Sequence, residues 1–310
     1  MSIQSVLLVI PSAAAQGILW SIMTLGVYLT FRILNYADLT VDGSFAFGGA
    51  VSAILIVKGM DPFVSLLFAT AAGMLSGVVT GLLHTKLKIP SILSGILSMI
   101  ALYSINIRVM GKANMPLLGE DTIISRLAFI SEDKTLIALI LGLVFSVLII
   151  FILYWFFGTE IGCCIRATGN NEYMVRALGG NTDQMKIIGL LLSNGLVALS
   201  GGMVAQQQGY ADVGMGTGTI VVGLASVIIG EVIFGWGEHS FGYKLATVVL
   251  GSIVYRIIIA LVLRMGLKST DLKLLTAIIV ALALSIPVIR KALQPLFHKT
   301  KQSFLRKQQA

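Results

Sequence analysis

The chain has 310 residues, of which 56% are hydrophobic and only 12% are charged. Soluble domains carry about 25% charged residues, so this composition excludes a water-soluble fold and indicates that the bilayer is the solvent. The formal net charge of +8 would suggest nucleic-acid binding in a soluble protein. Here we expect no nucleic-acid partner, because the excess is explained by cytoplasmic loops and by a basic cytoplasmic tail over residues 291–310.

Long apolar segments dominate the sequence from its start. A spanning helix needs about 20 mostly apolar residues, and nine segments fit. They predict an all-α, polytopic transmembrane bundle of eight to ten spans that forms one membrane domain over residues 1–290. The first segment lacks the basic start and cleavage site of a signal peptide, so we expect it to stay in the membrane. The predicted spans are 12–31, 43–57, 63–83, 89–107, 136–157, 187–208, 219–236, 243–263 and 274–289.

The second and seventh of these spans are short, and each follows a glycine- and polar-rich entry. Such paired interruptions suggest broken helices and an internal repeat with a pathway between its halves. Gly73, Gly77 and Gly81 recur every fourth residue and so share one helix face, which predicts close helix packing.

Four charged residues fall at or inside predicted spans, where charge is costly and is a functional hypothesis by default. Asp38 and Asp42 flank the start of the second span. They either cap a helix that starts inside the membrane or take part in the pathway. Glu231 and Arg256 lie deeper, and we expect them to form an ion pair within the bundle or between subunits.

A polar segment, residues 158–186, separates two long runs without charge. We call it the island. The loops on its side of the membrane hold the larger share of Lys and Arg, which places the island in the cytoplasm. Asn171 can cap a helix over residues 172–178, and Gly179 can end it. This short helix either docks into a groove of a soluble partner or only tethers two spans.

Sequence motifs for chemistry are missing. There is no phosphate-binding G-x-x-x-x-G-K-[ST], no zinc-binding H-E-x-x-H and no G-x-S-x-G elbow. Cys163 and Cys164 are adjacent and have no histidine nearby, so we interpret them as incidental thiols. We therefore expect no catalytic residue, no metal and no cofactor bound by this chain.

The segment from Gly162 to Gly209 resembles the permease subunits of ATP-binding cassette (ABC) importers for branched-chain amino acids and ribose-type sugars. The early stretch LNYADLTVDGSFAFGGA looks like the start of the same family's second helix. Two positions depart from the family pattern, Asn194 near the Ser-Gly stretch and Glu231 after Gly230. The matching elements, in order, are Arg166-Ala167, Gly169-Asn170-Asn171, Arg176-Ala177-Leu178-Gly179, Lys186 and Ser200-Gly201-Gly202.

This resemblance implies a multi-pass protein of the bacterial cytoplasmic membrane that works as a homodimer. It also implies two cytoplasmic ATP-binding subunits, which use ATP, and an extracellular or periplasmic solute-binding protein. The loop 108–134 and the segment 206–218 would meet that binding protein. The island would be the coupling element that the ATPase moves. Its expected contact residues are Arg166, Asn170, Asn171, Glu172, Tyr173 and Arg176.

The resemblance favours an amino acid as the solute, and an aromatic one such as tryptophan is our specific expectation. A sugar or nucleoside permease is the alternative within the class. An ion-coupled secondary transporter needs several membrane carboxylates, whereas only Glu231 lies deep. A membrane-embedded enzyme or scaffold lacks a catalytic cluster.

Overall fold

The computed structural model describes residues 9–128, 133–235 and 240–265, together with 271, 274–278, 280–281 and 285. The predicted tail, 291–310, lies outside the described residues, as does half of the ninth predicted span, 274–289. Long helices dominate the described part, and two three-residue strands complete it. The long helices are α2 (Ile10–Tyr28), α3 (Thr40–Val57), α4 (Pro62–Thr85), α5 (Ser91–Met110), α7 (Lys134–Gly158), α10 (Thr182–Gln208), α11 (Thr219–Phe234) and α12 (Phe241–Arg264).

Shorter elements join these helices. The π-helix η1 continues α2, and the 3-10 helix η2 precedes α11. They are η1 (Leu29–Ile33), β1 (Asn114–Pro116), α6 (Ile123–Arg126), α8 (Glu160–Asn170), α9 (Glu172–Ala177), β2 (Tyr210–Asp212) and η2 (Val213–Gly216).

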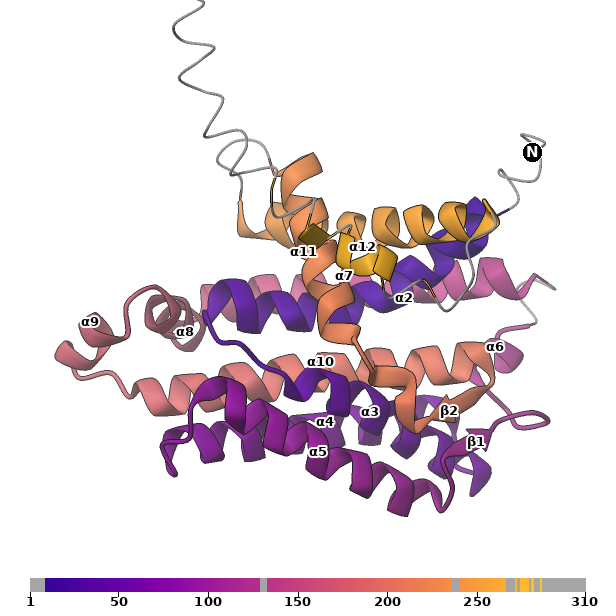
Figure 1. Cartoon of the computed structure of the whole chain (residues 1–310), viewed down its shortest axis with the longest axis horizontal. Helices are drawn as coiled ribbons and strands as arrows, with labels where there is room; N and C mark the ends of the chain where they lie inside the picture. Colours follow the sequence, from indigo (N-terminus) through magenta and orange to yellow (C-terminus); the bar gives the residue numbers. More distant parts are fainter. Residues whose placement is uncertain are drawn as a thin grey trace, which may run out of the picture.

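Eight described helices are long and apolar enough to cross a membrane. They coincide with the first eight predicted spans, so the predicted helical membrane bundle is confirmed. The island lies at one end of the bundle, which we call the island end. Strands β1 and β2 lie at the other, the strand end (Figure 1).

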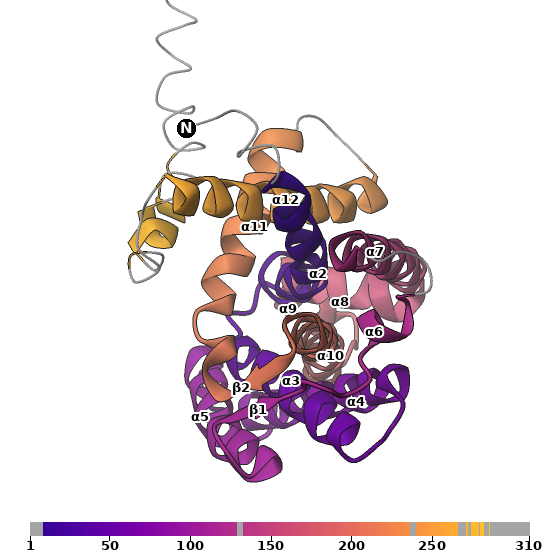
Figure 2. The same ribbon diagram turned by 90° about the vertical axis from the view of Figure 1, so that its right-hand side faces the viewer.

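Helix α10 runs through the centre of the bundle, and helices α2, α3, α4 and α7 surround it (Figure 2). Gly73 and Gly77 of α4 face it so closely that an added Cβ would clash with the backbone carbonyls of Asn194 and Leu190. Gly81 lies slightly farther from α10, where an added Cβ would come within 2.9 Å of a side-chain carbon of Ile187. The predicted glycine packing face is therefore confirmed, because only glycine permits this approach of the two backbones.

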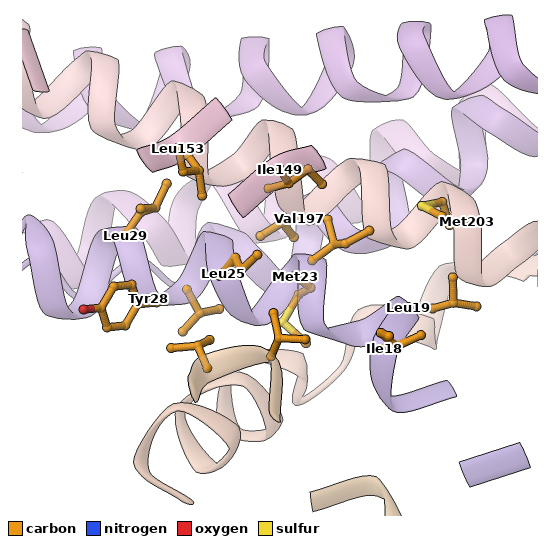
Figure 3. Close-up of a cluster of buried hydrophobic side chains, with 14 of the residues drawn as sticks. Ile18, Leu19, Met23, Leu25, Tyr28, Leu29, Ile149, Leu153, Val197 and Met203 are labelled. Carbon is orange, nitrogen blue, oxygen red and sulfur yellow. The ribbon is translucent and has the colours of Figure 1, made fainter. Parts of the chain in front are cut away.

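The apolar core lies between α2, α7 and α10 (Figure 3). Leu19, Met23 and Leu25 of α2 are almost fully buried, and Leu153 of α7 and Val197 of α10 pack around them. Because α2 is covered on nearly all sides, it reads as uniformly apolar rather than amphipathic. Helices α5 and α7, by contrast, keep large apolar side chains on the outer surface, as lipid-facing helices do.

Two loops at the strand end pair with each other, which the all-helical prediction did not include. Strand β1 is antiparallel to β2, with Asn114 opposite Asp212 and Pro116 opposite Tyr210. The two segments that were expected to meet a binding protein thus form one platform at the strand end.

Candidate functional site

The second and seventh spans are interrupted, and their helices start inside the bundle. Helix α3 follows an irregular segment, residues 34–39, and its Ser44 hydroxyl donates to Asn194 Oδ1 at 2.7 Å. Asn194 is near the midpoint of α10, so α3 starts at mid-depth. Helix α11 starts beside the first turn of α3. From there α3 runs toward the strand end, whereas α11 crosses the long axis of the bundle toward α12 (Figure 1). Two broken helices thus start side by side at mid-depth, as in other membrane transporters.

Asp42 caps a helix other than its own. Its carboxylate accepts hydrogen bonds from the Gly218 and Ile220 amides, at 2.8 and 2.9 Å, and from the Thr219 hydroxyl at 2.9 Å. These donors open α11, whose N-terminal amides have no partner within the helix. A negative charge there is further stabilised by the helix dipole. The capping interpretation of Asp42 is supported, although the helix that it caps is α11 rather than α3.

Asp38 is buried, and its carboxylate holds the start of α3. One carboxylate oxygen accepts from the Thr40 amide at 2.9 Å, and the other accepts from Asn194 Nδ2 at 2.7 Å. Asn194 also donates to the Leu190 carbonyl at 3.0 Å. The departure at Asn194 from the family pattern therefore has a local purpose, since its amide holds the buried carboxylate and the start of α3 together.

The expected ion pair between Glu231 and Arg256 is not formed within the chain. Glu231 pairs instead with Arg32 at the island end, where Arg32 Nε donates to Glu231 Oε1 at 2.8 Å and a second nitrogen contacts the other oxygen. Arg32 belongs to η1, and Glu231 lies in the last turns of α11. Within one chain the prediction is wrong, because a sequence does not show which of several basic residues the fold brings close to Glu231. A Glu231–Arg256 pair between subunits stays a prediction.

Arg256 lies over the ring of Trp20, with the guanidinium carbon 3.8 Å from the ring centroid. Its Nε is buried and has no hydrogen-bond partner among the described residues. Arg256 therefore has an aromatic neighbour and no carboxylate partner in the part of the chain that the structure describes.

Three cavities surround the start of α11. The α5 cavity, about 390 Å³, lies between α3 and α5 and is lined by Asp42, Asn106 and Thr217. The Arg256 cavity, about 410 Å³, shares Thr217 with it and is also lined by Trp20. The strand-end cavity, about 490 Å³, shares Trp20 and reaches Tyr210 on β2. Neighbouring hollows thus extend from the strand platform to the middle of the bundle.

The island folds into two short helices. The expected helix is confirmed as α9. The Asn171 side chain accepts from the Met174 amide at 3.1 Å, and the Gly180 amide closes the other end on the Val175 carbonyl at 2.9 Å. Gly179 has a φ of +84°, the left-handed conformation that ends helices.

Helix α8 was not predicted, although the sequence carries a signal for it. Thr159 caps the helix by accepting from the Gly162 amide at 3.3 Å, and Glu160 follows in the first turn. The helix then packs against η1 so closely that a Cβ at Gly169 would clash with the Ile33 carbonyl. This contact joins the island to the π-helix that holds Arg32.

The charged residues of α9 are engaged within the island rather than free for a partner. Arg176 donates to Glu172 at 2.6 Å, to the Thr182 hydroxyl at 2.7 Å and to Asp183 at 3.2 Å. Lys186 contacts Glu172 at 2.7 Å. Although partial burial raises the pKa of Glu172, the bonds and charges of Lys186 and Arg176 outweigh it, so the pKa lies below its usual value.

Three apolar side chains on α9 and on its C-terminal cap residue are exposed. Tyr173 and Leu178 are 84% and 80% exposed, and Met174 is 46% exposed, whereas Val175 faces inward. Of the other expected contact residues, Asn170 is exposed at the end of α8. Arg166 lies over the Phe241 ring at 5.7 Å and donates to Cys163 Sγ at 3.4 Å. The structure thus places the expected contact residues at one end of the molecule. Some of them, such as Glu172 and Arg176, are held by bonds within the island, and others, such as Tyr173, are exposed.

Among the described residues, no three or more His, Cys, Asp or Glu side chains gather so that they could hold a metal ion.

Comparison with known proteins gives a consistent set of relatives. The family model for the permease component of branched-chain amino acid transport systems matches residues 9–286. A protein of Clostridioides difficile (strain R20291), named as a tyrosine transport system permease protein, is 40% identical over 269 residues, covering 87% of this chain and 88% of the relative. An uncharacterized protein of Rickettsia prowazekii (strain Madrid E) is 34% identical over 276 residues, covering 88% and 96%.

Among solved structures, an inward-facing metal-chelate type ABC transporter is similar to this chain with a TM-score of 0.48 and 15% sequence identity. The match covers 91% of this chain and 85% of that one.

Proposed function

Because this chain belongs to the family of branched-chain amino acid transport permeases, it is the multi-pass membrane subunit of an ABC transporter, and we propose that it imports an aromatic amino acid. The proposed substrate is tyrosine or a similar aromatic amino acid such as tryptophan. The observation that carries this proposal is the 40% identity to a tyrosine transport system permease over 87% of the chain. A sugar or nucleoside has no comparable support.

The proposed assembly contains two copies of this chain, two cytoplasmic ATP-binding subunits and a solute-binding protein outside the membrane. The binding protein would dock on the strand end, where β1 and β2 form a platform above the strand-end cavity. ATP would be bound and hydrolysed only by the ATP-binding subunits. The sequence contains no phosphate-binding G-x-x-x-x-G-K-[ST] motif.

We assign docking of the ATPase to the exposed apolar face of α9, formed by Tyr173, Met174 and Leu178. A short helix with one apolar face suits a groove on a soluble partner. Arg176 and Glu172 act in this proposal as positioning residues, because their bonds to Thr182, Asp183 and Lys186 fix α9 to the first turns of α10.

Two connections would carry a movement of α9 into the membrane. The first is α10 itself, which begins at the island network and packs along α2, α3 and α4. The second runs from α8 through its close contact with η1 to the Arg32–Glu231 pair and so to α11. The far end of α11 is held by Asp42 beside the cavities. A displacement at the island would thus reach the helix start that borders the proposed pathway.

Uptake in cells tests the substrate assignment. A strain that lacks this gene should lose the uptake of labelled tyrosine, and the gene supplied in trans should restore it. Unlabelled tryptophan and phenylalanine should compete more strongly than leucine, and ribose should not compete. Unchanged tyrosine uptake in the deletion strain, together with loss of leucine or ribose uptake, would refute the proposed substrate.

A further inference from the structure

The Arg256 cavity, between α2, α11 and α12, combines one cation with apolar walls. Its lining includes Trp20, Val221, Tyr255 and Ile259 beside Arg256, and its volume of about 410 Å³ lies in the range of small-molecule sites. A guanidinium on an apolar wall suits a molecule with one anionic group and a large apolar part.

Within the described residues, the buried Nε of Arg256 has no hydrogen-bond partner. The guanidinium lies over the Trp20 ring, with its carbon 3.8 Å from the ring centroid. Glu231 is held by Arg32, and Asp42 is occupied by the start of α11. A buried donor without a partner costs about 1–3 kcal/mol, more for a charged group, so an unpaired arginine at this depth indicates a missing anion.

The depth of Arg256 in the bundle distinguishes two sources of that anion, a solute and a lipid headgroup. Trp20 lies ten residues into α2 from Ile10, and Arg256 lies eight residues before the end of α12. At a rise of about 1.5 Å per residue, both lie more than about 10 Å below the strand end. A lipid phosphate sits at the edge of a hydrocarbon core about 30 Å thick, so the depth favours a solute that enters the bundle over a headgroup.

The surroundings also favour a solute. The Arg256 cavity shares Trp20 with the strand-end cavity and Thr217 with the α5 cavity. It adjoins the start of α11, one of the two helices that begin at mid-depth. Substrate sites of other membrane transporters lie at such broken helices near the midplane.

We propose that Arg256 binds the carboxylate of the amino acid during its passage, with the Trp20 ring and the apolar wall receiving the side chain. This inference rests on the proposed function for the identity of the solute. A guanidinium binds a carboxylate through paired, charge-assisted hydrogen bonds, so the site would favour amino acids over their decarboxylated amines.

A binding measurement tests the site on the wild-type chain alone. The full chain, labelled with ¹⁵N-arginine, is placed in phosphatidylcholine nanodiscs, and the Arg256 Nε resonance is assigned by its absence from Arg256→Lys. Tyrosine and 4-hydroxyphenylpropionate should shift this resonance, whereas tyramine, which lacks the carboxylate, should not. No shift with either carboxylate overturns the inference. A shift caused by phosphatidylglycerol alone, with no further response to tyrosine, also overturns it in favour of a lipid headgroup.

A transport measurement gives the second test. In proteoliposomes with the ATP-binding subunits and the binding protein, Arg256→Gln should lower tyrosine uptake by at least about tenfold, and Arg256→Lys should lower it less. Lys86→Gln is the control, since Lys86 is an exposed cation at the end of α4 and belongs neither to the strand platform nor to the apolar face of α9. If the wild type transports tyrosine and Arg256→Gln transports it equally fast, the inference alone fails. If the wild type does not transport tyrosine, the proposed function fails, whatever the resonance shows.

Discussion

Asp42 offers a quantitative test of how the two broken helices hold each other. Replacing Asp42 with Ala removes the acceptor of the Gly218 and Ile220 amides. The Thr219 hydroxyl keeps its bond to the Gly216 carbonyl at 3.0 Å. Two amides are thus left without a partner, at about 1–3 kcal/mol each. Because Asp42 borders the α5 cavity, water can replace part of the loss, and we expect about 2–3 kcal/mol.

Asp42→Asn should fall between the wild type and Asp42→Ala. Its single amide oxygen can still accept from Ile220, whereas its NH₂ group cannot accept from Gly218. Asp61→Ala is the matched control. Asp61 caps its own helix, α4, by accepting from the Phe63 amide at 2.8 Å in an exposed turn, and it also pairs with the exposed Arg126. An exposed local cap contributes about 0.5–2 kcal/mol.

The assay is the free energy of unfolding of the purified full chain in mixed detergent micelles, measured for all four proteins under one condition. The reasoning predicts that stability decreases in the order wild type, Asp42→Asn, Asp42→Ala, with Asp61→Ala less affected than Asp42→Ala. An Asp42→Ala variant whose free energy of unfolding lies within about 0.5 kcal/mol of the wild-type value would refute the role of Asp42 as a stabilising cap of α11.

Three further predictions follow from the island and from the Arg32–Glu231 pair. Tyr173→Ala combined with Leu178→Ala should weaken binding of the ATP-binding subunits without changing the melting temperature. Arg176→Ala should instead increase hydrogen exchange throughout α9. Normal binding of the ATP-binding subunits by the double variant would refute the assignment of the docking face to α9. Because the pKa of Glu172 is lowered, its stabilisation of the island is complete above about pH 4.3 and is lost as the pH falls through its folded value. Exchange of the α9 amides should therefore rise on acidification in the wild type, but much less in Glu172→Gln, and equal pH profiles would contradict this assignment. In double-mutant cycles, Arg32→Gln and Glu231→Gln should be non-additive, by about 0.2–1 kcal/mol for so exposed a pair, while Glu231→Gln and Arg256→Gln should be additive; the reverse pattern would restore the pair that the sequence suggested.

The features that could be predicted from the sequence are those that local residue patterns determine. Eight spans follow from runs of apolar residues, and α9 follows from Asn171 and Gly179 at its two ends. The glycine face of α4 follows from a spacing of four residues. Each of these features depends on residues that are close in the sequence, so it can be predicted from a single sequence.

The remaining features depend on contacts between distant segments. Asp42 looked like a cap of its own helix, because a capping residue normally precedes the helix that it serves. Its actual partners are about 176 positions away in the chain. Arg32 and Glu231 are similarly distant, at 199 positions. The pairing of β1 with β2 could not be predicted either, since three-residue strands leave no alternating pattern.

Reconstitution measures the central claim most directly. Purified chain, ATP-binding subunits and solute-binding protein are placed in proteoliposomes, and accumulation of labelled tyrosine is followed with active ATP-binding subunits and with a catalytically inactive variant. The account predicts accumulation against the gradient that requires ATP and stops with the inactive ATPase. Tyrosine accumulation that continues at the same rate with the inactive ATPase would contradict it.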